Sequence, residues 1–177
     1  MILGLDISTS ITGYSVLDGQ TVVKCDMLDL RKKKYVDFLD KSVAAQSLLR
    51  DIKKQYPIKD IWIEETLNVM NRGMSSAHTI MTLNRFNGIL SWMAYETFGI
   101  KPRYISARQA RKMVGILVPK GADPKQTVIN FLLANEPQFT VSYSKLGNLV
   151  QGTADRADSL VIAKAGYQLC QNPSSTS

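Results

Sequence analysis

Three strand patterns follow one another at the start of the chain, and the segments between them are too short to hold a helix. Apolar residues run over 2–7 and over 14–17, and they then occupy every second position over 23–27. Asp18-Gly19 lies between the second and third patterns and is a strong signal for a tight hairpin turn. We therefore expect the chain to open with an antiparallel meander of three strands.

Helical and strand patterns alternate after this meander. Apolar residues recur at helical spacing over 36–55, and Pro57 ends that helix. A fourth strand is expected over 58–64, a long helix over 79–98 and a short fifth strand over 102–105. This order of elements predicts an α/β domain with a mixed five-stranded sheet that is flanked by helices.

Capping signals predict where further helices begin. Ser106 and Gln109 stand at capping-box spacing and open a short helix that ends near Gly115. An Asp-Pro pair at 123–124 starts another helix, because Asp is a good N-cap and Pro fits the first turn. A final helical pattern runs over 153–169.

Length and composition narrow the class of protein. The 177 residues predict a single domain over 1–170 and a flexible polar tail over 171–177. A net charge of +7 favours a polyanionic partner such as nucleic acid. Cys25 and Cys170 have no partner at zinc-site spacing, so we expect a reduced, cytoplasmic protein. Without a secretory leader or a run of about 20 apolar residues, no membrane role is expected.

Two carboxylates end strands that are otherwise apolar. Side chains alternate along a strand, so Asp6 shares a face with Gly4 and Ser8. Glu64 ends the fourth strand in the same way, whereas Glu65 points to the opposite face. A buried carboxylate needs a cation, a hydrogen-bond donor or a metal. For either residue alone, a structural salt bridge explains the sequence as well as a functional site does.

Two more carboxylates, Asp155 and Asp158, lie on one side of the last helix, near its start. Either one alone is explained by the favourable effect of acids at a helix N-terminus. Four clustered carboxylates stay ionised only if a compensating charge holds them. Oxygen ligands without His or Cys suit Mg²⁺ or Mn²⁺, and a pair of such ions suits phosphodiester cleavage. No small-molecule cofactor is expected.

Four segments of the chain resemble RuvC-type Holliday junction resolvases in their order and approximate spacing. They are ILGLDISTSITGYSV, DIWIEETL, ISARQARKMVG and TADRADSLVIA, and the resemblance covers essentially the whole chain. The first segment alone also resembles the opening of sugar kinases and actin-like ATPases, so the ordered set is the specific signal. Within the family, we expect a phage member.

The resemblance implies a ribonuclease H-like fold and a homodimer that holds a four-way DNA junction. It also implies metal-dependent endonuclease activity that makes paired nicks and leaves 5′-phosphate and 3′-hydroxyl ends. Asp6, Glu64, Asp155 and Asp158 match the family's catalytic carboxylates and would hold two ions per active site. In family terms Asp6 would bridge the ions, and Asp155 fills a position that varies between Asp and His.

Lys125 lies near the family's basic residue before the penultimate helix, where a cation would neutralise transition-state charge. The alternative is an exposed lysine at a helix start. Basic residues over 101–125 form a plausible phosphate track, whereas residues 31–34 fit a solvated turn. The expected DNA contacts are Arg108, Arg111, Lys112, Lys120, Lys125, Leu67 and Arg72. Leu67 stands where the family has an aromatic wedge, and Met70 and Met74 follow it, with packing the favoured role for these methionines.

The long helix presents an apolar face that has two explanations. Leu83, Phe86, Leu90 and Met93 either pack on the sheet or, by the family resemblance, include the dimer contact, with Trp92 on an adjacent face. The only histidine, His78, is expected to cap a helix or to lie on the surface.

Three functional alternatives stay open. The first alternative is a nuclease that cuts a wider range of branched DNA, including three-way junctions, flaps and forks. A phosphate-binding lobe of the sugar-kinase class is opposed by the lack of a second glycine-rich phosphate turn. A non-catalytic, junction-binding dimer is opposed by the four intact acids.

Overall fold

A five-stranded mixed sheet forms the centre of the computed structural model, which describes residues 1–66 and 77–171. Its strand order is β3-β2-β1-β4-β5, with β1–β2 and β2–β3 antiparallel and with β4 parallel to both β1 and β5. The strands are β1 (Ile2–Asp6), β2 (Ile11–Asp18), β3 (Thr21–Asp29), β4 (Asp60–Glu64) and β5 (Arg103–Ile105). The expected meander and the expected mixed sheet are therefore confirmed.

The β2–β3 hairpin differs from the simple alternation that the sequence predicts. Asp18 pairs with Thr21, and Gly19 has a φ of 59°, a left-handed conformation that glycine adopts at low cost. A register shift follows, because Val16 pairs with Lys24 while Leu17 pairs with Val22. The extra residue is Val23, which is 40% exposed. The bulge at Val23 therefore interrupts the regular alternation that the sequence predicts over 23–27.

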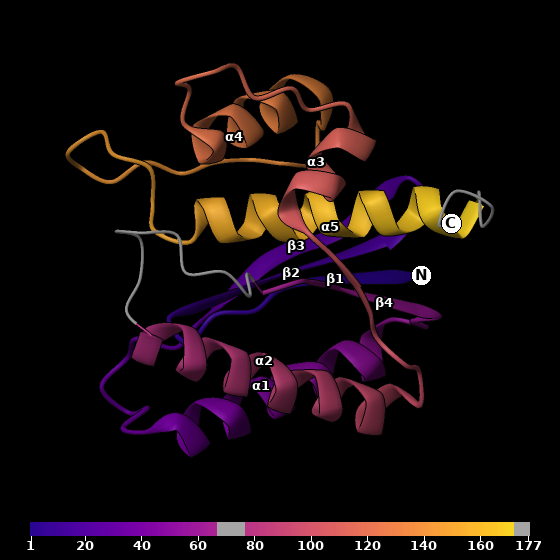
Figure 1. Cartoon of the computed structure of the whole chain (residues 1–177), viewed down its shortest axis with the longest axis vertical. Coiled ribbons are helices and arrows are strands. Elements are labelled where there is room, and N and C mark those ends of the chain that lie inside the picture. Colours follow the sequence, from indigo (N-terminus) through magenta and orange to yellow (C-terminus); the bar gives the residue numbers. More distant parts are fainter. Residues whose placement is uncertain (67–76, 172–177) are drawn as a thin grey trace.

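Helices cover both faces of the sheet (Figure 1). One face packs against α1 (Phe38–Gln55) and α2 (Ala77–Phe98), and the other packs against α5 (Thr153–Gln171). Two further helices, α3 (Ala107–Val114) and α4 (Pro124–Asn135), pack on α5. α5 extends through Gln171, the first residue of the predicted polar tail, and residues 172–177 lie outside the described part.

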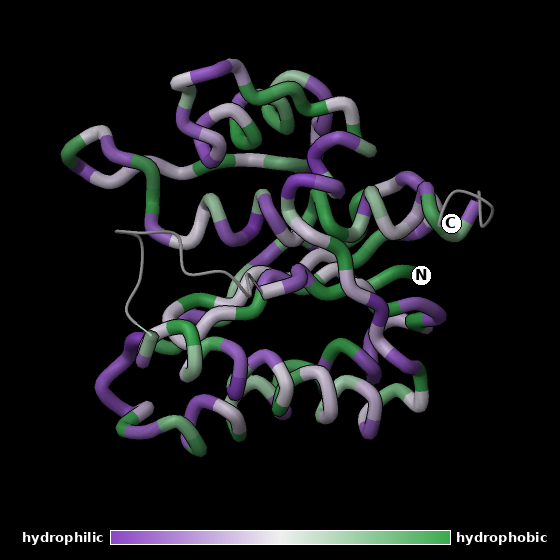
Figure 2. The backbone as a smooth tube through the Cα atoms, viewed as in Figure 1, coloured by the Kyte–Doolittle hydropathy of each residue, from purple (hydrophilic) through white to green (hydrophobic). Residues whose placement is uncertain are grey.

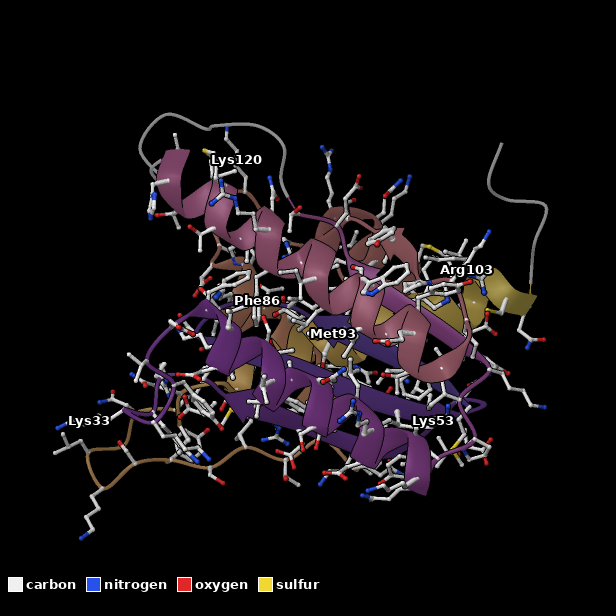
Figure 3. All side chains as sticks on the ribbon, turned by 90° about the horizontal axis from the view of Figure 1, so that it is seen from below. Lys33, Lys53, Phe86, Met93, Arg103 and Lys120 are labelled. Carbon is white, nitrogen blue, oxygen red and sulfur yellow. The ribbon has the colours of Figure 1, made fainter. Side chains whose placement is uncertain are left out.

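The buried face of α2 packs on the sheet rather than forming a free surface. Phe86 and Leu90 are 0% and 2% exposed, and Phe86 also contacts Phe38 of α1 edge-to-face at 5.4 Å. Figure 3 shows Phe86 and Met93 beneath the α2 ribbon. Hydrophobic and hydrophilic residues alternate along the helices in Figure 2, as expected when only one side of each helix is buried. Trp92 is 63% exposed on the outer side of α2.

The capping signals produce the helix starts that they predict. Ser106 and Gln109 form the full capping box, and Gly115 ends α3 with a φ of 85°. Asp123 caps α4 by accepting from the backbone N–H of Lys125 at 3.0 Å. His78 is exposed in the first turn of α2, so the surface role is confirmed.

α5 lies so close to the sheet that only glycine fits at the crossing points. A Cβ on Gly13 of β2 would lie 2.0 Å from the carbonyl oxygen of Asp155, and one on Gly4 of β1 would lie 2.5 Å from that of Ser159. The hydroxyls of Ser15 and Ser159 share a buried hydrogen bond of 2.9 Å. The start of α5 is therefore fixed over β2 and β1. In the described part of the chain, no helix has the length and apolar character needed to cross a bilayer.

Candidate active site

Two carboxylates lie next to each other where β1 and β4 end. Leu5 pairs with Ile63 in the parallel ladder, and Asp6 and Glu64 are the next residues of their strands. Two residues earlier on the same face, Gly4 and Trp62 contact α5, so by alternation Asp6 and Glu64 also face α5. Both side chains are half-buried.

The start of α5 brings two more carboxylates to this edge of the sheet. Gly13, whose Cα pairs with Asp6 across β1 and β2, lies directly under the backbone of Asp155. Asp155 and Asp158 are half-buried and lie in the first two turns of α5. Three separate elements therefore bring the four predicted carboxylates to the same edge of the sheet.

Burial and repulsion between neighbouring carboxylates raise the pKa of three members of this group. Burial raises the pKa of Asp6 well above its ordinary value, and repulsion from Glu64, Asp158 and Asp155 raises it further. Burial and then the charge of Asp158 raise the pKa of Glu64 to about 7. The pKa of Asp158 is raised as well, chiefly by burial. Burial and repulsion therefore oppose full ionisation of Asp6, Glu64 and Asp158 when no compensating positive charge is present.

The donor chemistry of the group fits a hard divalent cation. All four side chains offer carboxylate oxygens, which Mg²⁺ and Mn²⁺ prefer, and each is partly open to solvent. Their repulsion is what a divalent cation would relieve. In this conformation, no three of the described His, Cys, Asp and Glu side chains are placed so that they could hold an ion.

Two basic side chains face the acidic group. Lys125 lowers the pKa of Asp6, Glu64 and Asp158, and Arg111 lowers the pKa of Glu64 and Asp158. Among the described residues, the buried Nε of Arg111 has no hydrogen-bond partner. A buried N–H donor without an acceptor is unfavourable, so Arg111 is suited to a bound anion.

The other basic residues differ in their exposure and in their partners. Arg108, Lys112 and Lys120 are exposed. Arg103 does not belong to a free phosphate track, because it pairs with Asp60 and lies over the Trp62 ring at 4.4 Å.

Sequence reasoning missed the position of Arg31. Asp29 holds its guanidinium with two hydrogen bonds of 2.8 Å, and these raise its pKa, with a further contribution from Asp155. Arg31 therefore lies near the acidic group, whereas Lys33 extends outward (Figure 3). The only feature of the sequence that could have indicated this ion pair is the spacing of Asp29 and Arg31, which are two residues apart. Leu67, Met70, Arg72 and Met74 lie outside the described residues.

The sheet order, together with an α5 helix packed across β2, β1 and β4, defines a ribonuclease H-like fold. Solved structures of RuvC-type resolvases share this fold over nearly the whole chain. Thermus thermophilus RuvC in complex with a Holliday junction substrate has a TM-score of 0.64 at 11% identity, covering 97% of this chain and 95% of that one. A second Thermus thermophilus RuvC structure gives 0.63 at 11% identity, with coverages of 96% and 95%.

The yeast mitochondrial Holliday junction resolvase is also similar, with a TM-score of 0.62 at 12% identity, over 94% of this chain and 77% of that chain. No protein-family model and no curated protein sequence matches this sequence. The resemblance inferred from the four motifs is thus confirmed in the fold.

The raised pKa of Glu64 gives a testable effect on stability. In metal-free protein the folded state holds a proton on Glu64 up to about pH 7, whereas the unfolded state releases it near the ordinary value of 4.5. Wild-type stability should therefore fall as the pH rises from 4.5 through 7. Glu64→Gln does not lose stability in this way. In EDTA at pH 8 its free energy of unfolding should therefore be higher than that of wild type, on the order of 2 kcal/mol.

Urea unfolding of both proteins at pH 4 and pH 8 measures the effect, which should vanish at pH 4. Glu65→Gln is the matched control, because the exposed Glu65 lies on the opposite face and should show no such pH-dependent gain. An equal gain in both variants would mean that overall charge, rather than the acidic group, causes the effect.

Proposed function

We propose that this protein is a divalent-metal-dependent endonuclease that resolves four-way DNA junctions by paired nicks, leaving 5′-phosphate and 3′-hydroxyl ends. One observation carries the proposal: four carboxylates from β1, β4 and α5 lie at one edge of the sheet, where burial and the charges of Asp158 and Asp155 raise the pKa of Asp6 and of Glu64, with Arg111 and Lys125 beside them. The same fold in solved Holliday junction resolvases supports it.

The chain's own side chains have distinct roles in this proposal. Asp6, Glu64, Asp155 and Asp158 hold the metal, Mg²⁺ or Mn²⁺, with two ions per site. When bound, the ions stabilise charge on the attacking and leaving oxygens of the phosphodiester. Arg111 donates its unpaired N–H to a phosphate oxygen, and Lys125 neutralises charge that builds up on the phosphate. The exposed Arg108, Lys112 and Lys120 contact phosphates farther along the DNA.

Paired nicks require two active sites, so we propose a homodimer. The outer side of α2 supports such a contact, because Met81, Trp92 and Tyr95 are 54%, 63% and 38% exposed. Trp92 and Tyr95 pack together with ring centroids 5.8 Å apart. Trp92→Glu should therefore turn a dimer into a monomer, as measured by light scattering after size exclusion. Leu39→Ala, at an exposed position on α1, should leave the dimer intact.

The experiment that tests the function compares a labelled four-way junction with a linear duplex of the same sequence, in Mg²⁺ and in EDTA. We expect symmetric nicks in the junction that require Mg²⁺. Equal cutting of the duplex would point to a general nuclease, and tight junction binding without cutting would point to a non-catalytic junction-binding protein. Three-way junctions, flaps and forks in the same assay test the broader alternative, a nuclease for branched DNA in general.

Arg111 and Arg108 should have different effects on the reaction. Arg111→Ala removes the donor beside the acidic group, so kcat should fall about 100-fold. Arg108→Ala removes an exposed phosphate contact, so it should weaken binding modestly and reduce the slope of log affinity against log salt by about 1. Single-turnover cleavage and binding in EDTA at several salt concentrations separate the two. Equal losses of kcat would contradict the assignment.

We place this activity in the cytoplasm of a bacterium, or of the host cell if a phage encodes the protein.

A further inference from the structure

A hairpin over residues 141–150 projects from the connection between α4 and α5 and is not explained by the core. Tyr143 and Leu149 form a β-bridge, and backbone hydrogen bonds of 2.7 to 2.9 Å close the turn between them. Figure 1 shows this loop extending beyond the start of α5. Although it belongs to no helix or long strand, the hairpin has a defined backbone.

The base of the hairpin is attached to the same helix start that carries two of the acids. Phe139 is buried and lies under the guanidinium of Arg156 at 5.6 Å, and Arg156 follows Asp155 directly. On the other side, the Oγ1 hydroxyl of Thr153 donates to the carbonyl of Val150 at 2.6 Å. The hairpin is therefore held at a fixed place beside the acidic group.

The tip of the hairpin presents apolar side chains to solvent. Tyr143 is 61% exposed and Leu146 is 86% exposed, with Lys145 between them in sequence. Both hydrophobic and hydrophilic residues are visible at this tip in Figure 2. Exposed aromatic and aliphatic side chains at the end of a rigid hairpin leave water when a partner binds.

Charge favours nucleic acid as that partner. The segment 137–152 has no Asp or Glu and carries Lys145, while Ser142, Ser144 and Asn148 add hydroxyl and amide groups. A DNA strand at the acidic site would run beside this hairpin, because only two residues separate its last residue, Val150, from the start of α5. A positive, acid-free tip with an aromatic ring is suited to a phosphate backbone with exposed bases.

We infer that the 141–150 hairpin binds DNA at the branch point, with the Tyr143 ring stacking on a base that has lost its stacking neighbour there. Leu146 packs beside that base, and Lys145 contacts a phosphate. The inference rests on the proposed function and adds to it the residue that distinguishes branched DNA from linear duplex. Bases in a linear duplex are already stacked and offer no face to Tyr143.

The test measures binding in EDTA by fluorescence anisotropy, using the full chain with a labelled four-way junction and with a linear duplex. Tyr143→Ala should weaken junction binding about tenfold and change duplex binding less than about twofold. Tyr143→Phe keeps the ring and should bind like wild type. Leu39→Ala is the control for loss of an exposed apolar side chain elsewhere. Because Tyr143 is exposed, its variants should keep the wild-type melting temperature.

Each other outcome overturns the inference in a recognisable way. Wild-type binding by Tyr143→Ala would show that the ring takes no part. Equal weakening on junction and duplex would exclude recognition of the branch point. A monomeric Tyr143→Ala beside a dimeric wild type would assign the hairpin to self-association. If the wild type neither binds nor cuts the junction, the proposed function fails first and this inference falls with it.

Discussion

Asp6→Asn is expected to lower the rate of junction cleavage by about a thousandfold or more while leaving junction binding in EDTA within a few-fold of wild type. Asp6 ends β1 at the centre of the acidic group, and Glu64, Asp158 and Asp155 all act on its pKa. An amide has the same shape but provides one weaker oxygen donor and no charge. The loss should therefore affect catalysis far more than DNA affinity.

Single-turnover cleavage of a labelled junction in Mg²⁺, together with anisotropy in EDTA, measures the two effects separately. Asp18→Asn is the matched control, since Asp18 is exposed at the other end of the sheet and should cleave like wild type. Retained cleavage by Asp6→Asn would remove Asp6 from the chemistry and would contradict the proposed site. A parallel loss of binding would instead give Asp6 a structural role.

Gly13→Ala is expected to destabilise the fold by about 3 kcal/mol or more and to lower cleavage with it. A Cβ at this position would lie 2.0 Å from the carbonyl oxygen of Asp155 and 2.4 Å from its carbonyl carbon. Both atoms belong to the backbone, so no side-chain rotation relieves the clash. α5 must move away from β2, and Asp155 and Asp158 then shift relative to Asp6 and Glu64.

Urea unfolding monitored by circular dichroism gives the stability change, and the junction assay gives the activity. Gly88→Ala is the control, because among the described residues a Cβ there meets no atom within 4 Å apart from the neighbouring backbone of its own helix. In the middle of a helix, alanine is favoured over glycine by up to about 1 kcal/mol, so this variant should be as stable as wild type or slightly more stable. If Gly13→Ala has the stability and cleavage activity of wild type, α5 is not held where the structure places it.

Local signals in the sequence predicted most of the secondary structure. The capping residues around Ser106 and Asp123 act within one turn of helix, so their effect can be read directly from spacing. Apolar periodicity predicted the buried sides of α1 and α2 for the same reason. The bulge at Val23 was not predictable, because it depends on how two strands pair rather than on either strand alone.

The candidate site was predictable as a set of residues but not as an arrangement. Asp6 and Glu64 stand out because a carboxylate interrupts an apolar strand, and the ordered motifs added Asp155 and Asp158. The sequence does not distinguish Arg111, which faces the acids, from Lys112, which is exposed. That difference depends on how α3 packs against α5. Arg31 was missed because its proximity to Asp155 arises from tertiary contacts between β3 and α5.

The position of α5 in the chain also affects when the acidic group becomes complete during synthesis. β1 and β4 are synthesised well before residues 153–171, yet both strands depend on α5 to cover one face and to complete the acidic group. A nascent chain that stops before residue 153 leaves that face of the sheet exposed and lacks two of the four carboxylates. We therefore expect a chain truncated before residue 153 to aggregate and to lack a complete acidic group.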